Sequence, residues 1–270
     1  MNTIVKSEIE IRRLTTVARA LFPLFQEIGK TRLVDRTSLE VDKIVRRYMQ
    51  KRGLSSALEG YKAYKFASSV SVNGTAVHGL PSQRRLHRGD MFTLDVAATS
   101  AGYVSDSAWS FLMPGASNRY MELYRRSWRA FRRLLMELRS GITLDQLART
   151  ATVIAQSESI TIVPSLLGHG IGKEMHEAPV LTFVPTGGAA AKEISIPAGS
   201  VVNIEPVFTD GSGVITKLDD GWALATRDGA PTVHFELSVL MTDSDVQILQ
   251  YDRMSARKLP EEIPFGVIPG

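Results

Sequence analysis

Residues 89–111 read GDMFTLDVAATSAGYVSDSAWSF, and this stretch decides the fold. Two apolar, β-prone runs, Met91–Ala97 and Tyr103–Phe111, flank a Ser-Ala-Gly turn, which predicts an antiparallel hairpin. Asp95 and Asp106 stand on either side of the turn, so simple pairing sets them nearly opposite on one face; a bulge would shift this register by one residue. Because like charges repel there and apolar strands rarely hold unpaired carboxylates, a cation between them would create a binding site. The alternative is that one Asp caps the turn and the other is solvated.

The composition is that of an ordinary globular protein, with 270 residues, 44% hydrophobic and 22% charged. This length is sufficient for a large core, as one domain or as two fused halves. The chain has no cysteine, which excludes disulfides, Cys-ligated zinc and a Cys nucleophile, so a catalytic metal must use His, Asp and Glu. No apolar run is long enough to span a bilayer, and the charged N-terminus lacks a signal core. We expect a cytoplasmic monomer without membrane association.

The net charge is +4, and five arginines cluster on one predicted helix. Such a run is usually a solvated helix face. The alternative is a patch that docks on RNA, for example on the ribosome, or on an acidic partner. These residues are Arg125, Arg126, Arg129, Arg132 and Arg133.

Apolar periodicity and breakers predict the other elements. Helices are expected over 6–28 with Pro23 as a kink or boundary, Ser38–Lys51 with Ser38 as its cap, 118–139, and Thr143–Glu158 opened by Thr143. Strands are expected over Phe66–Asn73, Ile160–Pro164, Val201–Phe208, Val233–Thr242 and Val246–Tyr251, and the tail from Arg253 either wraps the surface or stays loose.

The order of these elements is an approximate structural duplication, since each half supplies paired helices and part of a mostly antiparallel sheet. An α+β fold with helices covering one face of the sheet follows. We expect one catalytic domain over residues 1–251, with halves of approximately 1–115 and 116–251, and a proline-containing tail over 252–270.

Three further polar residues stand in surroundings that suggest a ligand. His169 lies between two glycines, which allow backbone to approach whatever the imidazole binds. Glu205 and Glu236 each interrupt an apolar strand. Singly, a strand Glu is more often a solvent-facing residue and His169 a satisfied core histidine. As a set with Asp95 and Asp106, they indicate a metal site.

Four acids and one imidazole suit two divalent ions with bridging carboxylates, which would activate water and polarise a carbonyl. Oxygen-rich ligation with a single His favours Mn²⁺, Fe²⁺ or Co²⁺ over a structural zinc.

The motifs resemble those of the type I methionine aminopeptidases, of the "pita-bread" metallopeptidase family. The similarity covers roughly residues 6 to 250, and the set of five ligands with two flanking histidines is its most specific part. The matching segments are Gly60-Tyr61…Tyr64, Asn73…His78-Gly79-Leu80-Pro81, Asp95, Asp106, Gly168-His169-Gly170-Ile171-Gly172…His176-Glu177…Pro179, Ile204-Glu205-Pro206, Asp220-Gly221-Trp222 and Phe235-Glu236.

The resemblance implies a pita-bread fold, a pseudo-two-fold, curved sheet with helices on its outer face, and removal of N-terminal methionine from peptides or nascent chains. It implies that Asp95 binds one metal, that Asp106 and Glu236 bridge the pair, and that His169 and Glu205 hold the other. Glu205 would accept the proton of the nucleophilic water.

Two histidines complete the catalytic set that the resemblance implies. His176 would hydrogen-bond the scissile carbonyl and its oxyanion. His78 would contact the substrate's amine side or help to carry a proton to the leaving amine. Interpreted without the resemblance, His78 is a loop histidine that satisfies backbone groups, and His176 is a helix-cap or surface residue.

The resemblance also implies an apolar pocket for the first side chain of the substrate. Three positions near the centre depart from the family's common residues: Ser69 replaces Cys, Met175 replaces Phe and His234 replaces Gln. The metal chemistry should survive, whereas a relaxed or altered specificity, or resistance to a pocket-directed inhibitor, are open hypotheses. The pocket residues are Tyr61, Tyr64, Ser69, His78, Met175 and Trp222.

Two alternatives keep the fold and change the function. One is a metallohydrolase acting on Xaa-Pro peptides or a small pathway metabolite. The other is a catalytically silent binding protein, which would be expected to have lost ligands, whereas none of the five is missing here. The short segment between His176 and Glu205, with no extra domain before Ile9, favours the type I form over the proline-specific relatives and creatinase.

Overall fold

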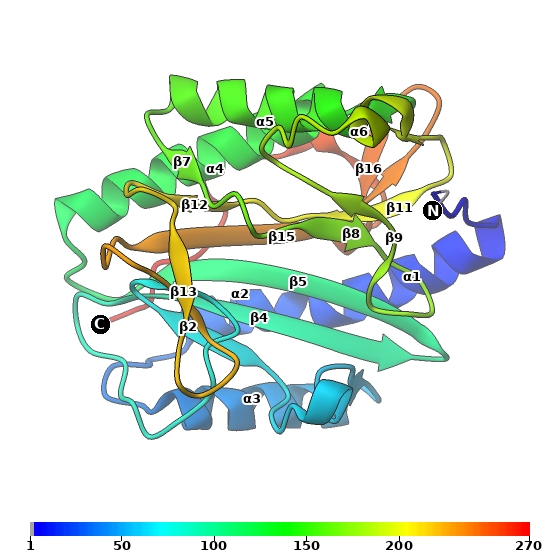
Figure 1. Ribbon diagram of the computed structural model, residues 1–270. Coiled ribbons are helices and arrows are strands. Elements are labelled where there is room, and N and C mark those ends of the chain that lie inside the picture. Colours follow the sequence, from blue (N-terminus) through cyan, green and yellow to red (C-terminus); the bar gives the residue numbers. More distant parts are fainter. Residues whose placement is uncertain (1–2) are drawn as a thin grey trace.

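A large antiparallel sheet forms the centre of the molecule (Figure 1). The computed structural model describes residues 3–270. Over these residues the sheet has twelve strands, and every pairing between them is antiparallel. Its main path runs through β1 (Ser55–Ser56), β4 (Met91–Ser100), β5 (Tyr103–Leu112), β15 (Thr232–Met241), β11 (Val201–Ile204), β8 (Gly168–Gly170) and β9 (Glu177–Leu181).

The remaining strands of this sheet extend it at its edges, and two small sheets accompany it. β2 (Ser69–Val72) pairs with β4, β12 (Val207–Thr209) pairs with β15 and β7 (Thr161–Ile162), and β16 (Val246–Ile248) pairs with β15 and β17 (Met254–Ser255). The small sheets are β13 (Ile215–Lys217), β14 (Leu224–Thr226) and β3 (Thr75–Val77), and β10 (Ser195–Ile196) with β6 (Ile142–Thr143).

The predicted central hairpin is formed by β4 and β5, but its register differs from the expected one. Ala101 and Gly102 both have positive φ, 50° and 77°, so they form the two-residue turn whose twist suits a hairpin. Asp95 therefore pairs with Ala108, and Asp106 pairs with Ala97. The prediction that the two acids lie nearly opposite each other was wrong, because the turn is centred one residue later. They lie diagonally, two residues apart on the same face.

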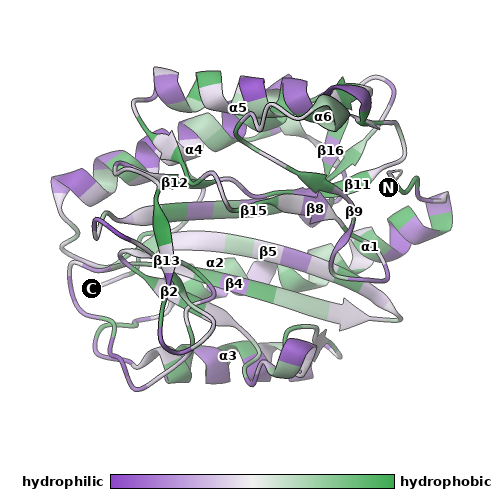
Figure 2. Cartoon of the chain, in the orientation of Figure 1, coloured by the Kyte–Doolittle hydropathy of each residue, from purple (hydrophilic) through white to green (hydrophobic). Residues whose placement is uncertain are grey.

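In the described part of the chain, residues 3–270, six α-helices lie around this sheet: α1 (Glu8–Leu21), α2 (Pro23–Lys30), α3 (Ser38–Lys51), α4 (Asn118–Glu137), α5 (Leu144–Ser157) and α6 (Ala189–Glu193). In Figure 1, α1 and α2 lie behind β4 and β5, while α4 and α5 lie at the upper side of the sheet and α3 at the lower side. Green and purple alternate along α4 and α5 in Figure 2, as expected for helices with one buried face.

Helix boundaries follow the capping chemistry. The predicted boundary at Pro23 is confirmed, because proline begins α2 where a missing N–H costs nothing. Thr143 caps α5 as predicted, in a reciprocal pair with Gln146. The prediction of Ser38 as a cap was wrong by one residue: Thr37 accepts from the Glu40 amide, and Glu40 accepts in return from the Thr37 amide.

The C-terminal tail is packed against the sheet, so the wrapped alternative is the one observed. The Leu112 amide donates to the Gly266 carbonyl at 2.8 Å, and the Ile268 amide donates to the Leu112 carbonyl at 2.9 Å. Phe265 stacks on Trp109 with ring centroids 4.4 Å apart.

The division of the domain into two halves stays a prediction. Within residues 3–270, no helix has both the length and the apolar character that crossing a membrane requires.

Candidate metal centre

One cleft of about 830 Å³ brings together every site residue that the sequence predicted. It opens where the hairpin β4–β5, strand β15 and the segments around β8 and β9 meet. Its lining includes Tyr61, Tyr64, Ser69, His78, Asp95, Asp106, His169, Met175, His176, Glu205, Trp222 and Glu236.

Strand register sets three of the acids around one alanine. Ala108 of β5 pairs with Asp95 of β4 on one side and with Glu236 of β15 on the other. Asp106 lies two residues along β5, on the same face. Side chains of directly paired residues are only about 5 Å apart at Cβ, so the small, fully buried Ala108 leaves space between acidic groups.

Glu205 enters the same space from a break in a strand. Its neighbour Pro206 has no amide N–H and cannot continue the ladder, so the predicted strand over 201–208 divides into β11 and β12. Ile204 is the last residue of β11 and pairs with Leu237, next to Glu236. Glu205 Oε1 lies 3.2 Å from Nε2 of His169.

The strand β8 fixes the His169 ring. Its Nδ1 donates to the Gly170 carbonyl at 3.0 Å, so Nε2 faces Glu205. A Cβ at residue 168 would lie 2.6 Å from the Asn203 carbonyl oxygen, and one at residue 170 would collide with the Ala178 carbonyl. Both glycines are therefore required for this close approach of backbone.

The acids repel one another in a site with little water. Burial raises the pKa of Asp106 to about 6. Burial, followed by the charges of Asp106 and Glu205, raises the pKa of Asp95 and of Glu236 well above their usual range. Burial lowers the pKa of His169, but the contact with Glu205 outweighs it and raises the value to about 9. The site therefore attracts positive charge.

The donor set fits divalent cations. Asp106, His169 and Glu236 each offer a ligand atom within 4.8 Å of the others, and Glu205, His234 and Glu236 form a second such group. Glu236 belongs to both. Within residues 3–270, Asp106 Oδ1 is buried without a hydrogen-bond partner, which is costly unless a cation occupies that position. Asp95 belongs to neither group but lines the same cleft.

A buried network that the sequence did not predict supports Glu236. Asn203 Nδ2 donates to Glu236 Oε1 at 2.7 Å, and Ser238 Oγ donates to Asn203 Oδ1 at 2.7 Å. Gln250 Nε2 donates to Ser107 Oγ at 2.9 Å, and its carbonyl oxygen accepts from the Ser238 amide. Asn203 inside an apolar strand was the one sequence signal of this network.

His176 and His78 lie at the cleft on loops rather than strands. The His176 ring is 4.3 Å from that of His169, and its Nδ1 is 3.2 Å from the Tyr61 hydroxyl. Loss of water in the cleft, followed by the charge of His169, lowers the pKa of His176 to about 4. His176 is therefore a neutral hydrogen-bonding group at pH 7. His78 has a positive φ of 58°, which turns the chain after β3.

Aromatic rings and small side chains form one end of the cleft. Tyr64 packs edge-to-face on Trp222 with centroids 4.9 Å apart, and its hydroxyl donates to the Ser68 carbonyl at 2.9 Å. Ser69 pairs with Asp95 across β2 and β4, and Met175 is buried nearby in the lining. This end has the character of an apolar side-chain pocket next to the acids.

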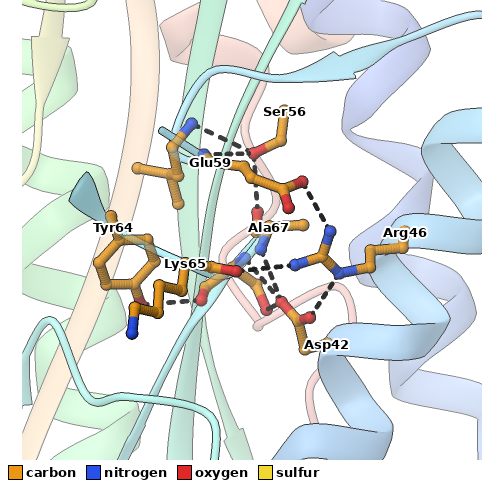
Figure 3. A network of polar contacts seen from close by, with 9 residues as sticks. Asp42, Arg46, Ser56, Glu59, Tyr64, Lys65 and Ala67 are labelled. Atoms are coloured by element: carbon orange, nitrogen blue, oxygen red, sulfur yellow. Dashed lines mark hydrogen bonds and ion pairs between the residues drawn. The ribbon is translucent and has the colours of Figure 1, made fainter. Parts of the chain in front are cut away.

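Helix α3 holds the loop that carries the two tyrosines (Figure 3). Asp42 is buried and accepts from the Ala67 and Ser68 amides and the Ser68 hydroxyl, each at 2.9 Å. Arg46 contacts Asp42 at 2.9 Å and donates to Glu59 at 2.6 Å and to the Lys65 carbonyl. The sequence analysis did not identify this network, since both charged residues fit a solvated helix face.

A buried group of acids and imidazoles in a cleft of a large antiparallel sheet is typical of a metalloprotein whose divalent ions are open to a substrate. The model of metallopeptidase family M24 matches residues 10–243, and the chain belongs to this family. Divalent metal binding is thereby supported at the level of the family; the number and kind of ions remain predictions.

Methionine aminopeptidases are among the most similar proteins, which confirms the resemblance. Methionine aminopeptidase 1 of Bacillus subtilis is 29% identical over 91% of this chain and 98% of its own length. A solved methionine aminopeptidase from Thermotoga maritima is 28% identical, with a TM-score of 0.86 over 92% of this chain and 99% of that one. A Xaa-Pro dipeptidase from Bacillus anthracis, 21% identical with a TM-score of 0.74, shares the fold. The predicted pita-bread fold is confirmed.

Proposed function

We propose that this chain is a metal-dependent aminopeptidase that removes N-terminal methionine from peptides or nascent chains. The observation that carries the proposal is the convergence of all five predicted ligands, with His78 and His176, on one cleft. The match to methionine aminopeptidases, over 91–92% of this chain and 98–99% of theirs, supports the same activity.

Two divalent ions, Mn²⁺, Fe²⁺ or Co²⁺, are proposed to bind Asp95, Asp106, His169, Glu205 and Glu236. When bound, they lower the pKa of water and polarise the scissile carbonyl. Asp106 and Glu236 are the proposed bridges, and Glu236 belongs to both ligand groups described above.

The chain's own residues position the substrate and move its protons. Glu205 accepts the proton of the attacking water. Neutral His176, held by the Tyr61 hydroxyl, donates a hydrogen bond to the oxygen that becomes negative. His78 faces the amine side of the scissile bond. Tyr64, Ser69, Met175 and Trp222 enclose the first side chain in an apolar surrounding.

The test begins with protein stripped by a chelator and verified to be metal-free. Addition of Mn²⁺, Fe²⁺ or Co²⁺ should restore hydrolysis of Met-Ala peptides. Asp106→Ala and Glu236→Ala should abolish hydrolysis, because each removes a proposed bridge, whereas Glu122→Ala on the outer face of α4 should not. Near-normal turnover in both bridge variants would contradict the assigned roles.

Specificity is a separate question, because Ser69, Met175 and His234 differ from the family's common residues. Kinetics on Met-Ala, Leu-Ala and Pro-containing peptides separates a methionine-selective enzyme from a relaxed or Xaa-Pro-directed one. A silent binding protein would hydrolyse none of them and would purify without stoichiometric divalent ion.

The arginines of α4 have structural partners. Arg125 and Arg126 pair with Glu122, while Arg129 and Arg133 pair with Glu158. Arg132 donates to the Leu259 carbonyl. These contacts favour a solvated helix face. Ribosome contact stays a hypothesis, and it predicts that replacing the five arginines by Glu abolishes salt-sensitive binding of the protein to ribosomes.

Cytoplasmic location and a monomeric state stay predictions. Light scattering tests the monomeric state.

A further inference from the structure

His234 is a buried imidazole to which the proposed function assigns no role. It lies on β15 two residues before Glu236, so both side chains are on the same face of the strand. The residue is only 2% exposed. Among residues 3–270, neither of its ring nitrogens has a hydrogen-bond partner.

The backbone of His234 is held firmly. Its amide donates to Ser110 Oγ at 2.8 Å, and Ser110 Oγ donates to its carbonyl at 3.1 Å. These bonds hold the main chain, and the ring lies at a buried position with two unpaired polar atoms. An unpaired buried polar atom costs about 1–3 kcal/mol, so a ligand for the ring is expected at this place.

The ring of His234 lies next to two side chains that can bind metal, Glu205 and Glu236. His234, Glu205 and Glu236 each bring one ligand atom within 4.8 Å of the others. His234 Nε2 lies 3.9 Å from Glu205 Oε2, too far for a hydrogen bond. The other oxygen of Glu205 faces His169. The Glu205 carboxylate therefore lies between two imidazoles.

These separations suit a shared cation. Metal–nitrogen and metal–oxygen bonds of about 2.1 Å place two ligand atoms of one ion about 3–4 Å apart. The 3.9 Å between His234 Nε2 and Glu205 Oε2 lies in that range, and the three ligand atoms of this group are all within 4.8 Å of one another. The imidazole of His234 offers a nitrogen donor of the kind that divalent metals bind.

We propose that His234 Nε2 is a sixth protein ligand of the metal centre, shared with Glu205 and Glu236. The inference rests on the proposed metal centre and deepens it. An added imidazole strengthens binding of Co²⁺ and Zn²⁺ more than that of Mn²⁺, because nitrogen ligands suit the former ions better. The centre of the wild-type chain should therefore discriminate more strongly against Mn²⁺ than that of a His234→Gln variant.

The first test counts ligated histidines in the intact wild-type chain. The protein has five histidines, so long-range ¹H–¹⁵N spectra of histidine-labelled, metal-free protein resolve each ring. Addition of Zn²⁺ should move one ring nitrogen of His169 and one of His234 to the shift of a metal-bound nitrogen. A change at His169 alone, with stoichiometric Zn²⁺ uptake, would overturn the role of His234 and leave the metal centre intact.

The second test uses His234→Gln, with His87→Gln as a matched control in an exposed loop. Co²⁺ affinity from calorimetry should fall at least about tenfold in His234→Gln and Mn²⁺ affinity by less, because a nitrogen ligand is lost. His87→Gln should change neither. Equal affinities in His234→Gln and wild type would overturn the proposal. If the wild type binds none of Zn²⁺, Co²⁺ and Mn²⁺, the proposed metal centre itself is contradicted, and not only the role of His234.

Discussion

At the scale of single residues, Ala108 determines whether the acidic groups can surround a cation. It is fully buried and pairs with both Asp95 and Glu236. We expect Ala108→Val to fill the space between them and to lower metal affinity at least about tenfold, since its two added methyl groups cannot be accommodated without displacing ligands. Calorimetric titration with Mn²⁺ measures this effect.

Ala98→Val is the matched control for that substitution. Ala98 is as fully buried and lies in the same hairpin, but it occupies the opposite face of β4. Both variants should lose about 1–3 kcal/mol of stability through overpacking, and Ala98→Val alone should keep its metal affinity. If both bind metal as the wild type does, the space around Ala108 is not what accommodates the ion.

His169 makes the metal-free protein sensitive to pH. Its folded pKa of about 9 exceeds the ordinary value of 6.5, so folding takes up a proton. The resulting contribution of protonated His169 to the free energy of unfolding is complete below pH 6.5 and is lost as the pH rises through 9. The free energy of unfolding in chelator should therefore fall by about 1–3 kcal/mol between pH 7 and pH 9.

Denaturant titrations at the two pH values check this prediction, and His169→Gln should flatten the difference. The stabilisation that bound metal adds has the opposite pH dependence and grows as the pH rises, because the ligands bind metal only in their deprotonated forms. The rise in melting temperature on adding Mn²⁺ should accordingly be larger at pH 8 than at pH 6. An identical pH dependence in wild type and His169→Gln would show that other groups dominate.

At the scale of elements, the network of Asp42 connects helix α3 to the loop that carries Tyr61 and Tyr64. Its carboxylate accepts three hydrogen bonds from Ala67 and Ser68, in the loop after Tyr61 and Tyr64. Asp42→Ala leaves these donors unpaired, so we expect a loss of about 2–4 kcal/mol in stability. The Michaelis constant for Met-Ala peptides should rise more than kcat falls, because the tyrosines are proposed to contact substrate rather than metal.

Glu59→Gln provides the comparison, since Glu59 also pairs with Arg46 but is half-exposed. Exposed ion pairs contribute at most about 1 kcal/mol, so this variant should differ little from wild type in melting temperature and in steady-state kinetics. A larger effect for Glu59→Gln than for Asp42→Ala would mean that the guanidinium, not the carboxylate, holds the loop.

The elements also show why some features were predictable from sequence and others were not. Thr143 and Pro23 marked helix ends locally, and apolar, β-prone runs were sufficient to predict β4, β5 and β15. The diagonal register of Asp95 and Asp106 depended on which two residues took positive φ, a choice that alternation does not determine. Asn203 and Asp42 act through partners far along the chain, and no local pattern reports such contacts.

At the scale of the whole molecule, the tail and the metal centre lie on opposite faces of β5. Trp109, on which Phe265 stacks, alternates with Ala108 and Ser110 and so faces away from the cleft. Trp109 in turn packs edge-to-face on Phe235, at 5.0 Å, and Trp128 donates to the Glu261 carbonyl. The tail therefore stabilises the sheet without touching the proposed ligands.

This arrangement predicts a separation of stability from metal binding. Phe265→Ala removes a stacked, partly buried ring and should cost about 2–4 kcal/mol, lowering the melting temperature by several degrees. Calorimetric Mn²⁺ affinity at 20 °C should stay within about twofold of wild type. Val267→Ala, an exposed tail residue, should change neither quantity. A large loss of metal affinity in Phe265→Ala would instead mean that the tail sets the positions of β5 and β15, and with them the spacing of Asp106 and Glu236.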